Sequence, residues 1–220
     1  GMHRALFTID ASTGQISVAT AELDHERFSS YHLTVNVTDN GAPGATPLHN
    51  SVVVEVRVND VNDVPVPLLP GVGGTGEGAV SENAGIGWDV HATVGVYDDD
   101  PTQTHTFTIT DGADGMFAIP DPTVGVIRVA STGLHFESKS VYNITVRVTD
   151  NGSPELWAEV WVIVRLRDLN ELPVFDHSTR TISEAAPVGT ELPPALPAHV
   201  SDQDAGSVHK YYLVSGDYGD

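Results

Sequence analysis

The chain has no cysteine among its 220 residues, and basic residues are scarce. The absence of cysteine excludes thiolate zinc sites, a cysteine nucleophile and a disulfide framework. Ten lysines and arginines stand against thirty acidic residues, which gives a formal net charge of −20. Proteins that bind nucleic acid or anionic membrane surfaces carry a basic face, so this charge balance argues against both classes.

Long apolar runs are missing as well. The most hydrophobic stretch, residues 156–166, is interrupted by Glu159 and Arg165, and no run approaches the roughly 18 residues of a membrane span. The first residues do not form the pattern of a signal peptide. We therefore expect any signal or membrane anchor to lie outside this sequence.

What the chain does have is enough apolar sequence to fold and an excess of like charge. Hydrophobic residues make up 40% of the sequence, which is normal for a protein with a core. A compact protein with this net charge repels itself unless something cationic neutralises it. A divalent metal is one candidate, and a soluble acidic protein without metal is the alternative that composition leaves open.

Comparison of the sequence with itself reveals tandem repeats of about 110 residues. The segment YHLTVNVTDNG at 31–41 recurs as YNITVRVTDNG at 142–152, and DVNDVP at 60–65 recurs as DLNELP at 168–173. We predict three units: the C-terminal half of one repeat at 1–65, a complete repeat at 66–175, and the N-terminal part of a third at 176–220. The partial units indicate either a piece of a longer array or head-to-tail assembly between molecules.

Within each repeat the apolar residues alternate with polar ones. In residues 31–38 and 52–58 every second residue is apolar, which is typical of half-buried antiparallel strands. No segment shows a sustained helical period. Roughly seven short strands in each repeat, separated by turns rich in Asn, Gly and Pro, predict an all-β fold of tandem Greek-key β-sandwiches.

Acidic residues recur where the predicted strands end. Asp24 and Glu26 are two residues apart, as are Asp98 and Asp100, and residues at this spacing on a strand point the same way. Carboxylates this close repel one another and raise one another's pKa. A cation between them reverses that repulsion, and Ca²⁺ prefers six to eight oxygen ligands of this kind.

With these motifs the sequence resembles the cadherin family along its whole length. The family's repeats carry an early Glu, a Leu-Asp-Arg-Glu segment, an Asp-x-Asp pair and an Asp-x-Asn-Asp-Asn-x-Pro linker, which converge from successive repeats on Ca²⁺. The resemblance implies two groups of calcium ligands. The first acidic cluster comprises Asp24, Glu26, Asp60, Asn62, Asp63, Asp98, Asp100 and Asp150, with the backbone carbonyl of Val64.

The second acidic cluster departs further from the family's pattern. It comprises Glu82, Glu137, Asp168, Asn170, Glu171, Asp202 and Asp204. His135 stands where the family has an aspartate, and Glu171 replaces the linker aspartate. Histidine is a poor ligand for a hard cation, so we expect one or two ions here and a weak or absent outermost ion.

The resemblance implies a calcium-binding extracellular segment that acts as a stiffened rod in calcium-dependent cell adhesion. Its expected partners are other cadherin-repeat proteins, bound homophilically or heterophilically, and the parent protein is expected to be a membrane-anchored cell-surface protein. The alternative is a non-adhesive ligand- or carbohydrate-binding or structural module of a large secreted or surface protein.

We predict that the chain is not an enzyme. The glycine-rich string GVGGTG at 71–76 follows Pro67 and Pro70 and has no helical pattern after it. It therefore indicates a loop rather than a dinucleotide-binding turn. The paired acids recur with the repeat and lie at its ends, whereas a glycosidase needs its two carboxyl groups in one cleft.

Two further features concern the outer surface. The motifs beginning at Asn36, Asn143 and Asn151 are glycosylation sequons, which are characteristic of surfaces of secreted glycoproteins. The alternation also predicts that Trp161 and Ile163 point outward from their strand. They form either a contact surface or a patch covered by a loop or a neighbouring repeat.

Overall fold

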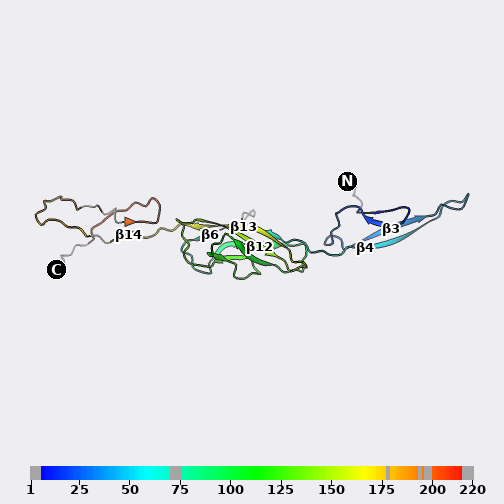
Figure 1. The fold of residues 1–220 in the computed structure, drawn as a ribbon, viewed down its shortest axis with the longest axis horizontal. Helices are drawn as coiled ribbons and strands as arrows, with labels where there is room; N and C mark the ends of the chain where they lie inside the picture. The colour runs from blue at the N-terminus through cyan, green and yellow to red at the C-terminus, as the bar shows by residue number, and fades with distance from the viewer. Residues whose placement is uncertain (1–5, 70–75, 177–178, 193–194, 196–199, 215–220) are drawn as a thin grey trace. The chain divides into compact units, whose positions relative to one another are not determined.

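The computed structural model describes residues 6–69, 76–176, 179–192, 195 and 200–214, and the glycine-rich segment up to residue 75 lies outside them (Figure 1). Every regular element in this described part is a β-strand, and none of it forms a helix that could cross a membrane. The strands are β1 Phe7–Ile9, β2 Ile16–Val18, β3 Ser30–Thr38, β4 His49–Arg57, β5 Val66–Leu68, β6 Glu77–Ser81, β7 Asp89–Thr93, β8 Gly95–Tyr97, β9 Thr106–Asp111, β10 Phe117–Ala118, β11 Val126–Val129, β12 Val141–Thr149, β13 Trp157–Arg167, β14 Val174–Phe175 and β15 Val200–Ser201.

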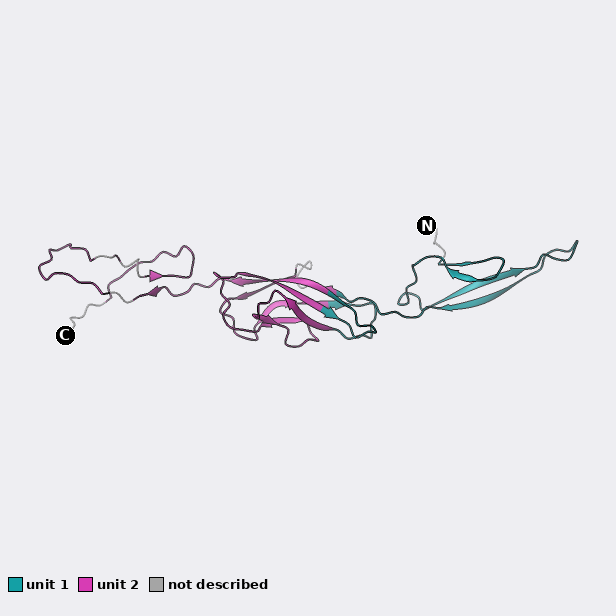
Figure 2. Cartoon of the chain, in the orientation of Figure 1, with its two compact units in different colours: residues 1–66, 96–105, 148–158 teal, residues 67–95, 106–147, 159–220 magenta. Residues whose placement is uncertain are grey.

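The chain divides into two compact units, coloured separately in Figure 2. One unit contains residues 1–66, 96–105 and 148–158, and the other contains residues 67–95, 106–147 and 159–220. All residues of the first acidic cluster belong to the first unit and all residues of the second cluster belong to the second. The repeat boundaries after residues 65 and 175 stay predictions from the sequence.

The sandwich between residues 77 and 167 has two main sheets, and β8 within it pairs with β5 in a further two-stranded sheet. One sheet has the strand order β6-β13-β12-β9, and the other has the order β10-β11-β7. Strand β6 runs parallel to β13, with Ile163 opposite Glu77. The two sheets approach closely where β6 faces β7: a Cβ on Gly78 would stand 2.5 Å from the carbonyl oxygen of Val90. Only glycine fits there.

The core lies between these two sheets. Alternate residues of β12 and β13 are buried, as a sheet with one covered face requires. Side chains from the facing sheet and its loops complete the core, which is aliphatic with a few aromatic rings. Its buried hydrophobic members include Val90, Ala92, Val94, Phe107, Phe117, Ile127, Val129, Leu134, Tyr142, Ile144, Val146, Val148, Val162, Val164 and Leu166. The prediction of an all-β sandwich is confirmed.

The first unit contains a long antiparallel hairpin. Strands β3 and β4 pair from Ser30 opposite Arg57 to Thr38 opposite His49. The short β1-β2 hairpin covers the Tyr31 end of β3, where the Phe7 and Tyr31 rings meet edge to face with centroids 5.2 Å apart. Toward the other end the hairpin is open on both faces, and Val53 is 59% exposed.

Candidate metal centre

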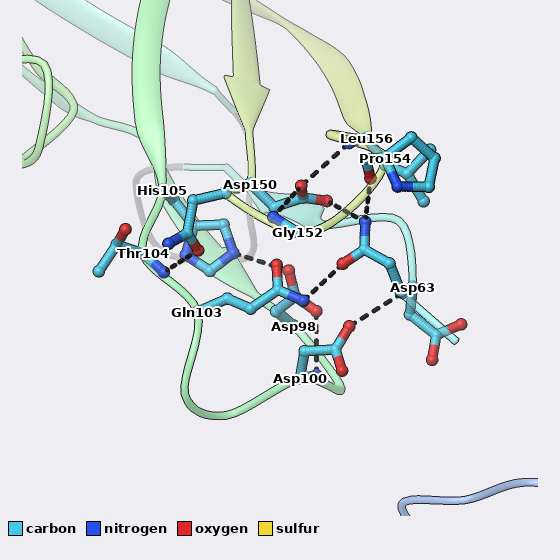
Figure 3. Close-up of polar contacts among 12 residues, drawn as sticks. Asp63, Asp98, Asp100, Gln103, Thr104, His105, Asp150, Gly152, Pro154 and Leu156 are labelled. Carbon is cyan, nitrogen blue, oxygen red and sulfur yellow. Dashed lines mark hydrogen bonds and ion pairs between the residues drawn. The ribbon is translucent and has the colours of Figure 1, made fainter. Parts of the chain in front are cut away.

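The first acidic cluster is assembled from segments that follow strand ends. The linker after β4 supplies Asn62 and Asp63, the loop after β8 supplies Asp98 and Asp100, and Asp150 follows the last residue of β12. Figure 3 shows these side chains converging with their hydrogen bonds. Polar side chains gather here because strand ends leave backbone groups that need partners.

Asp150 is buried and fully engaged. Its Oδ1 accepts hydrogen bonds from the backbone N–H of Gly152 and of Leu156, both at 2.9 Å, and its Oδ2 accepts one from Nδ2 of Asn62 at 3.1 Å. The same Asn62 amide donates to the carbonyl of Pro154 at 2.8 Å. These bonds fix the linker on the end of the sandwich (Figure 3).

A second chain of hydrogen bonds joins the linker to the Asp-x-Asp pair. The backbone N–H of Asp63 donates to Oδ2 of Asp100 at 2.9 Å, and the backbone N–H of Asp100 donates to Oδ1 of Asp98 at 3.0 Å. Nε2 of His105 lies 2.7 Å from Oδ2 of Asp98. Asp100 therefore has one carboxylate oxygen tied to the linker, and both oxygens of Asp98 are engaged. These hydrogen bonds form a frame that orients the two carboxylates.

A cavity of about 330 Å³ opens beside this frame. Its lining includes Asp24, Glu26, Asp63 and Asp99, so carboxylates face one space from three segments. Burial, together with the charges of Glu26 and then Asp100, raises the pKa of Asp63 above its ordinary value. At one edge, one side-chain atom each from His25, Glu26 and Asp60 lie within 4.8 Å of one another. The site is thus rich in negative charge, and His25 lies 3.1 Å from Glu26 at its edge.

The second acidic cluster repeats the frame of the first. The backbone N–H of Glu171 donates to Oδ2 of Asp204 at 2.9 Å, and that of Asp204 donates to Oδ1 of Asp202 at 3.0 Å. Nε2 of His209 lies 2.8 Å from Oδ2 of Asp202, and this bond is the main cause of the lowered pKa of Asp202. The same local sequence pattern has built the same geometry twice.

Glu82 anchors the second cluster from the sandwich side. Burial alone would raise the pKa of this carboxyl, but the backbone N–H groups of Phe136 and Leu169 each donate to it at 2.9 Å. These bonds, together with the charge of His135, hold the pKa of Glu82 below its ordinary value. The carboxylate therefore stays ionised although its residue is buried.

Four carboxylates of this cluster come together. One oxygen each from Glu82, Glu137, Asp168 and Glu171 lie within 4.8 Å of one another. Burial, followed by repulsion from the neighbouring carboxylates, raises the pKa of both Asp168 and Glu171. Among the described residues, Oε2 of Glu171 is buried and has no hydrogen-bond partner. A buried acceptor without a donor calls for a ligand.

The chemistry of both clusters fits Ca²⁺. The grouped atoms are almost all carboxylate oxygens, which a hard cation prefers, and no thiolate is available for zinc or copper. A bound cation would neutralise the mutual repulsion that raises the pKa values of Asp63, Asp168 and Glu171. The buried Oε2 of Glu171 would gain the partner that the described residues do not supply.

Two of the expected ligands are placed differently from the grouped carboxylates. The side-chain amide of Asn62 is engaged in hydrogen bonds within the protein: besides the bonds donated by its Nδ2, its Oδ1 accepts one from Nε2 of Gln103 at 2.5 Å. Nδ2 of Asn170 donates to the carbonyl of Glu171 at 3.2 Å. These amides position the linkers, and the ligand roles of Asn62, Asn170 and the Val64 carbonyl remain predictions.

The sequence interpretation missed the histidines of the frame. His105 follows Asp98 by the same interval as His209 follows Asp202, so the repeat itself carried the signal. It was overlooked because histidine was considered only as a metal ligand. His25, Asp99 and Gln103 also lie at the first cluster, although the sequence did not single them out as ligands.

Comparisons with known proteins agree with this geometry. The family described as "Cadherin domain" matches residues 1–59 and 77–167, more than half of the chain. The chain belongs to the cadherin family. This cadherin segment is 35% identical over 221 residues to the "Protocadherin-like wing polarity protein stan" of Drosophila melanogaster, covering 96% of the segment and 6% of that protein. It is 32% identical over 224 residues to human "Protocadherin Fat 1", covering 98% of the segment and 5% of that protein.

Solved structures place the segment among cadherin extracellular domains. It matches the EC22-24 structure of mouse cadherin-23 with a TM-score of 0.67 and 29% identity, over 92% of the segment and 62% of that chain. The curated relatives are far longer than the segment, which spans 5–6% of the two named above. The comparisons therefore establish a cadherin extracellular segment.

Proposed function

We propose that both acidic clusters bind Ca²⁺ and that this segment serves calcium-dependent adhesion at the cell surface. Calcium binding is a general property of cadherin domains, and such domains are generally non-enzymatic. The observation that carries the proposal for this chain is the group of Glu82, Glu137, Asp168 and Glu171, together with the buried Oε2 of Glu171, which has no hydrogen-bond partner among the described residues.

The two clusters assign distinct tasks to their members. We assign the carboxylates of Glu26, Asp63, Glu137, Asp168 and Glu171 to the ion, because they face other carboxylates in the two clusters. Asp98, Asp202 and the asparagines hold the frame. Ca²⁺ binds the ordered cluster and not an unfolded chain, so it stabilises the arrangement in which linker and sandwich tip lie together.

In the parent protein we expect this segment to be one part of a long extracellular array that meets other cadherin-repeat proteins. Calcium would restrict the motion of the linkers at residues 60–65 and 168–173. When each linker is held at its own cluster, the segment can transmit force, and the outer faces of its repeats are presented in one geometry. Without calcium, the like charges of each cluster repel and free the linker.

The test is aggregation of beads that carry the full chain. Beads should cluster in calcium and disperse in a chelator, and beads carrying Glu171→Gln should need more calcium to cluster. Retention of the beads on a glycan array without clustering would contradict adhesion and favour a carbohydrate-binding module. Dispersed beads in calcium, with calcium bound to the protein, would contradict adhesion by this segment while leaving the metal sites intact.

A further inference from the structure

The outer face of the sheet β6-β13-β12-β9 carries an exposed tryptophan that no interaction described above uses. Trp161 on β13 is 75% exposed, and its neighbour Ile163 is half-buried. The outward orientation predicted for both is thus confirmed. An exposed tryptophan beside a half-buried isoleucine forms an apolar patch on this face, and contiguous apolar patches mark contact surfaces.

The pairing of β12 with β13 shows what lies across from these residues. The backbone N–H of Asp150 donates to the carbonyl of Leu156 at 3.0 Å, and that of Leu166 donates to the carbonyl of Ser140 at 2.8 Å. Moving along β12 from Asp150 to Ser140 takes the partner on β13 from Leu156 to Leu166, the same number of residues, so both bonds belong to one antiparallel register without a bulge between them. The ion pair between Arg147 and Glu159, with Nη2 and Oε1 2.9 Å apart, fits the same register.

This register places Thr145 opposite Trp161 and Asn143 opposite Ile163. Both are non-hydrogen-bonded pairs, the kind in which side chains stand closest, with Cα atoms about 4.5 Å apart. Asn143 and Trp161 are then diagonal neighbours at about 7–8 Å, a distance that long side chains bridge. The sequon Asn143-Ile144-Thr145 therefore lies beside the exposed tryptophan on the same face.

The surroundings of Asn143 leave room for a large substituent. The Asn143 side chain is exposed and makes no hydrogen bond among the described residues. On its other flank lies Gly112, where φ is +80° and a Cβ would stand 1.7 Å from the Asn143 carbonyl oxygen. No side chain can occupy that position, so Gly112, the residue after β9, presents only its backbone to Asn143.

The other two sequons differ from this one. Oδ1 of Asn151 accepts a hydrogen bond from the backbone N–H of Thr104 at 2.9 Å, which ties Asn151 into the loop beside the first cluster. Oδ1 of Asn36 accepts one from Oγ of Ser51 at 2.5 Å. Across from Asn36 stands Ser51, with no aromatic ring in that pair. Of the three sequon asparagines, Asn143 alone combines a side chain without such a bond among the described residues with an exposed tryptophan, Trp161, on the neighbouring strand.

We propose that Asn143 carries an N-linked oligosaccharide whose first sugars lie over Trp161 and Ile163. In the transfer, the side-chain nitrogen of Asn143 bonds to the anomeric carbon of a lipid-linked oligosaccharide pyrophosphate. The bond from that carbon to the pyrophosphate oxygen breaks, the lipid pyrophosphate leaves with the electron pair, and the amide gives up one proton. The apolar faces of the sugars then cover the indole while their hydroxyl groups remain in water.

The experiment compares two changes of the same hydroxyl residue in the full chain, secreted from animal cells. Thr145→Ser keeps the sequon and Thr145→Ala destroys it. Mass spectrometry of the peptide containing Asn143 should find the glycan in the wild type and in Thr145→Ser and lose it in Thr145→Ala. An unmodified Asn143 in the secreted wild type overturns the proposal.

Cover over the tryptophan is measured separately by hydroxyl-radical labelling. The ratio of Trp161 to Trp88 labelling should rise several-fold in Thr145→Ala, because Trp88 is also exposed, at 59%, and serves as the internal reference. Should that variant not be secreted, native enzymatic removal of the glycan from the wild type gives the same comparison. An unchanged ratio with Asn143 glycosylated overturns the covering of Trp161.

Discussion

The backbone N–H of Glu171 donates a hydrogen bond to Oδ2 of Asp204 at 2.9 Å, and this bond draws the second linker onto the loop that carries the Asp-x-Asp pair. Asp63 and Asp100 make the same bond, also at 2.9 Å, in the first cluster. In both places the linker's acidic side chain is left facing other carboxylates while its backbone is fixed. The frame thus forces like charges together before any cation arrives.

Removal of one crowded carboxylate should weaken calcium binding without unfolding the protein. In Glu171→Gln, calcium affinity of the second cluster should fall roughly tenfold or more, because the number of charged ligands sets the affinity. The calcium-free variant should melt no lower than the wild type, since a repelled charge has been removed. Calorimetric titration gives the affinity and differential scanning calorimetry gives the midpoint.

The matched control is Glu191→Gln, which makes the same charge change at an exposed residue outside both clusters. Its calcium affinity should equal that of the wild type. Equal affinities in Glu171→Gln and Glu191→Gln would remove Glu171 from the site.

Acidification should stabilise the calcium-free protein over a limited range. The pKa values of Asp63, Asp168 and Glu171 are raised in the folded state. A raised folded-state pKa contributes stability that is present below the unfolded-state pKa and is lost as pH rises through the folded-state value. In chelator, the thermal midpoint should therefore rise as pH falls from neutral toward about 5.

Below that range the trend should reverse. The pKa values of Glu82 and Asp202 are lowered, and such groups lose their contribution as pH falls through the folded-state values. In saturating calcium the thermal midpoint should instead fall as pH falls from neutral toward about 5, because protons then compete with the ion for the carboxylates. A midpoint in chelator that only falls from neutral pH downward would contradict the proposed crowding of carboxylates.

The location of the core predicts a sharp contrast between two isoleucines. Ile144 on β12 is 0% exposed, whereas Ile86 is 65% exposed. Ile144→Ala should lower the free energy of unfolding by about 2–5 kcal/mol, the usual cost of truncating a buried aliphatic side chain. Ile86→Ala should change it by about 0.5 kcal/mol or less. Denaturant unfolding of both variants in calcium checks this. Equal losses of unfolding free energy in the two variants would contradict this location of the core.

The strands were predictable wherever one face of a sheet is covered. Residues 31–38 alternate and form β3, Ser30–Thr38. The alternating segment 52–58 overlaps β4, His49–Arg57, up to Arg57. The strand starts earlier than the segment because its first residues are polar and carry no periodic signal. Alternation indicates which face favours burial and not whether a covering layer is present. The sequence placed Val53 on the outward face, where it is exposed, but the 60% exposure of Val52 on the other face could not be read from it.

The candidate site was predictable to the level of residue types and no further. Repetition and family resemblance picked out the acids, since both depend on sequence spacing. The hydrogen bond from Asn62 to Asp150 and the ion pair of His105 with Asp98 depend on how loops meet in three dimensions. The buried, unpartnered Oε2 of Glu171 likewise emerges only when four segments are packed together.

Calcium titration of the full chain by isothermal calorimetry, with magnesium titrated in parallel, tests the central claim most directly. The account predicts saturable calcium uptake at both clusters, with dissociation constants on the order of 10⁻⁴–10⁻³ M as in extracellular calcium modules, and much weaker uptake of magnesium. At a free calcium concentration about 100 times the dissociation constant, each site should stabilise the fold by about 2.7 kcal/mol. Heats of dilution alone in a folded chain, with the thermal midpoint unmoved by calcium, would contradict it.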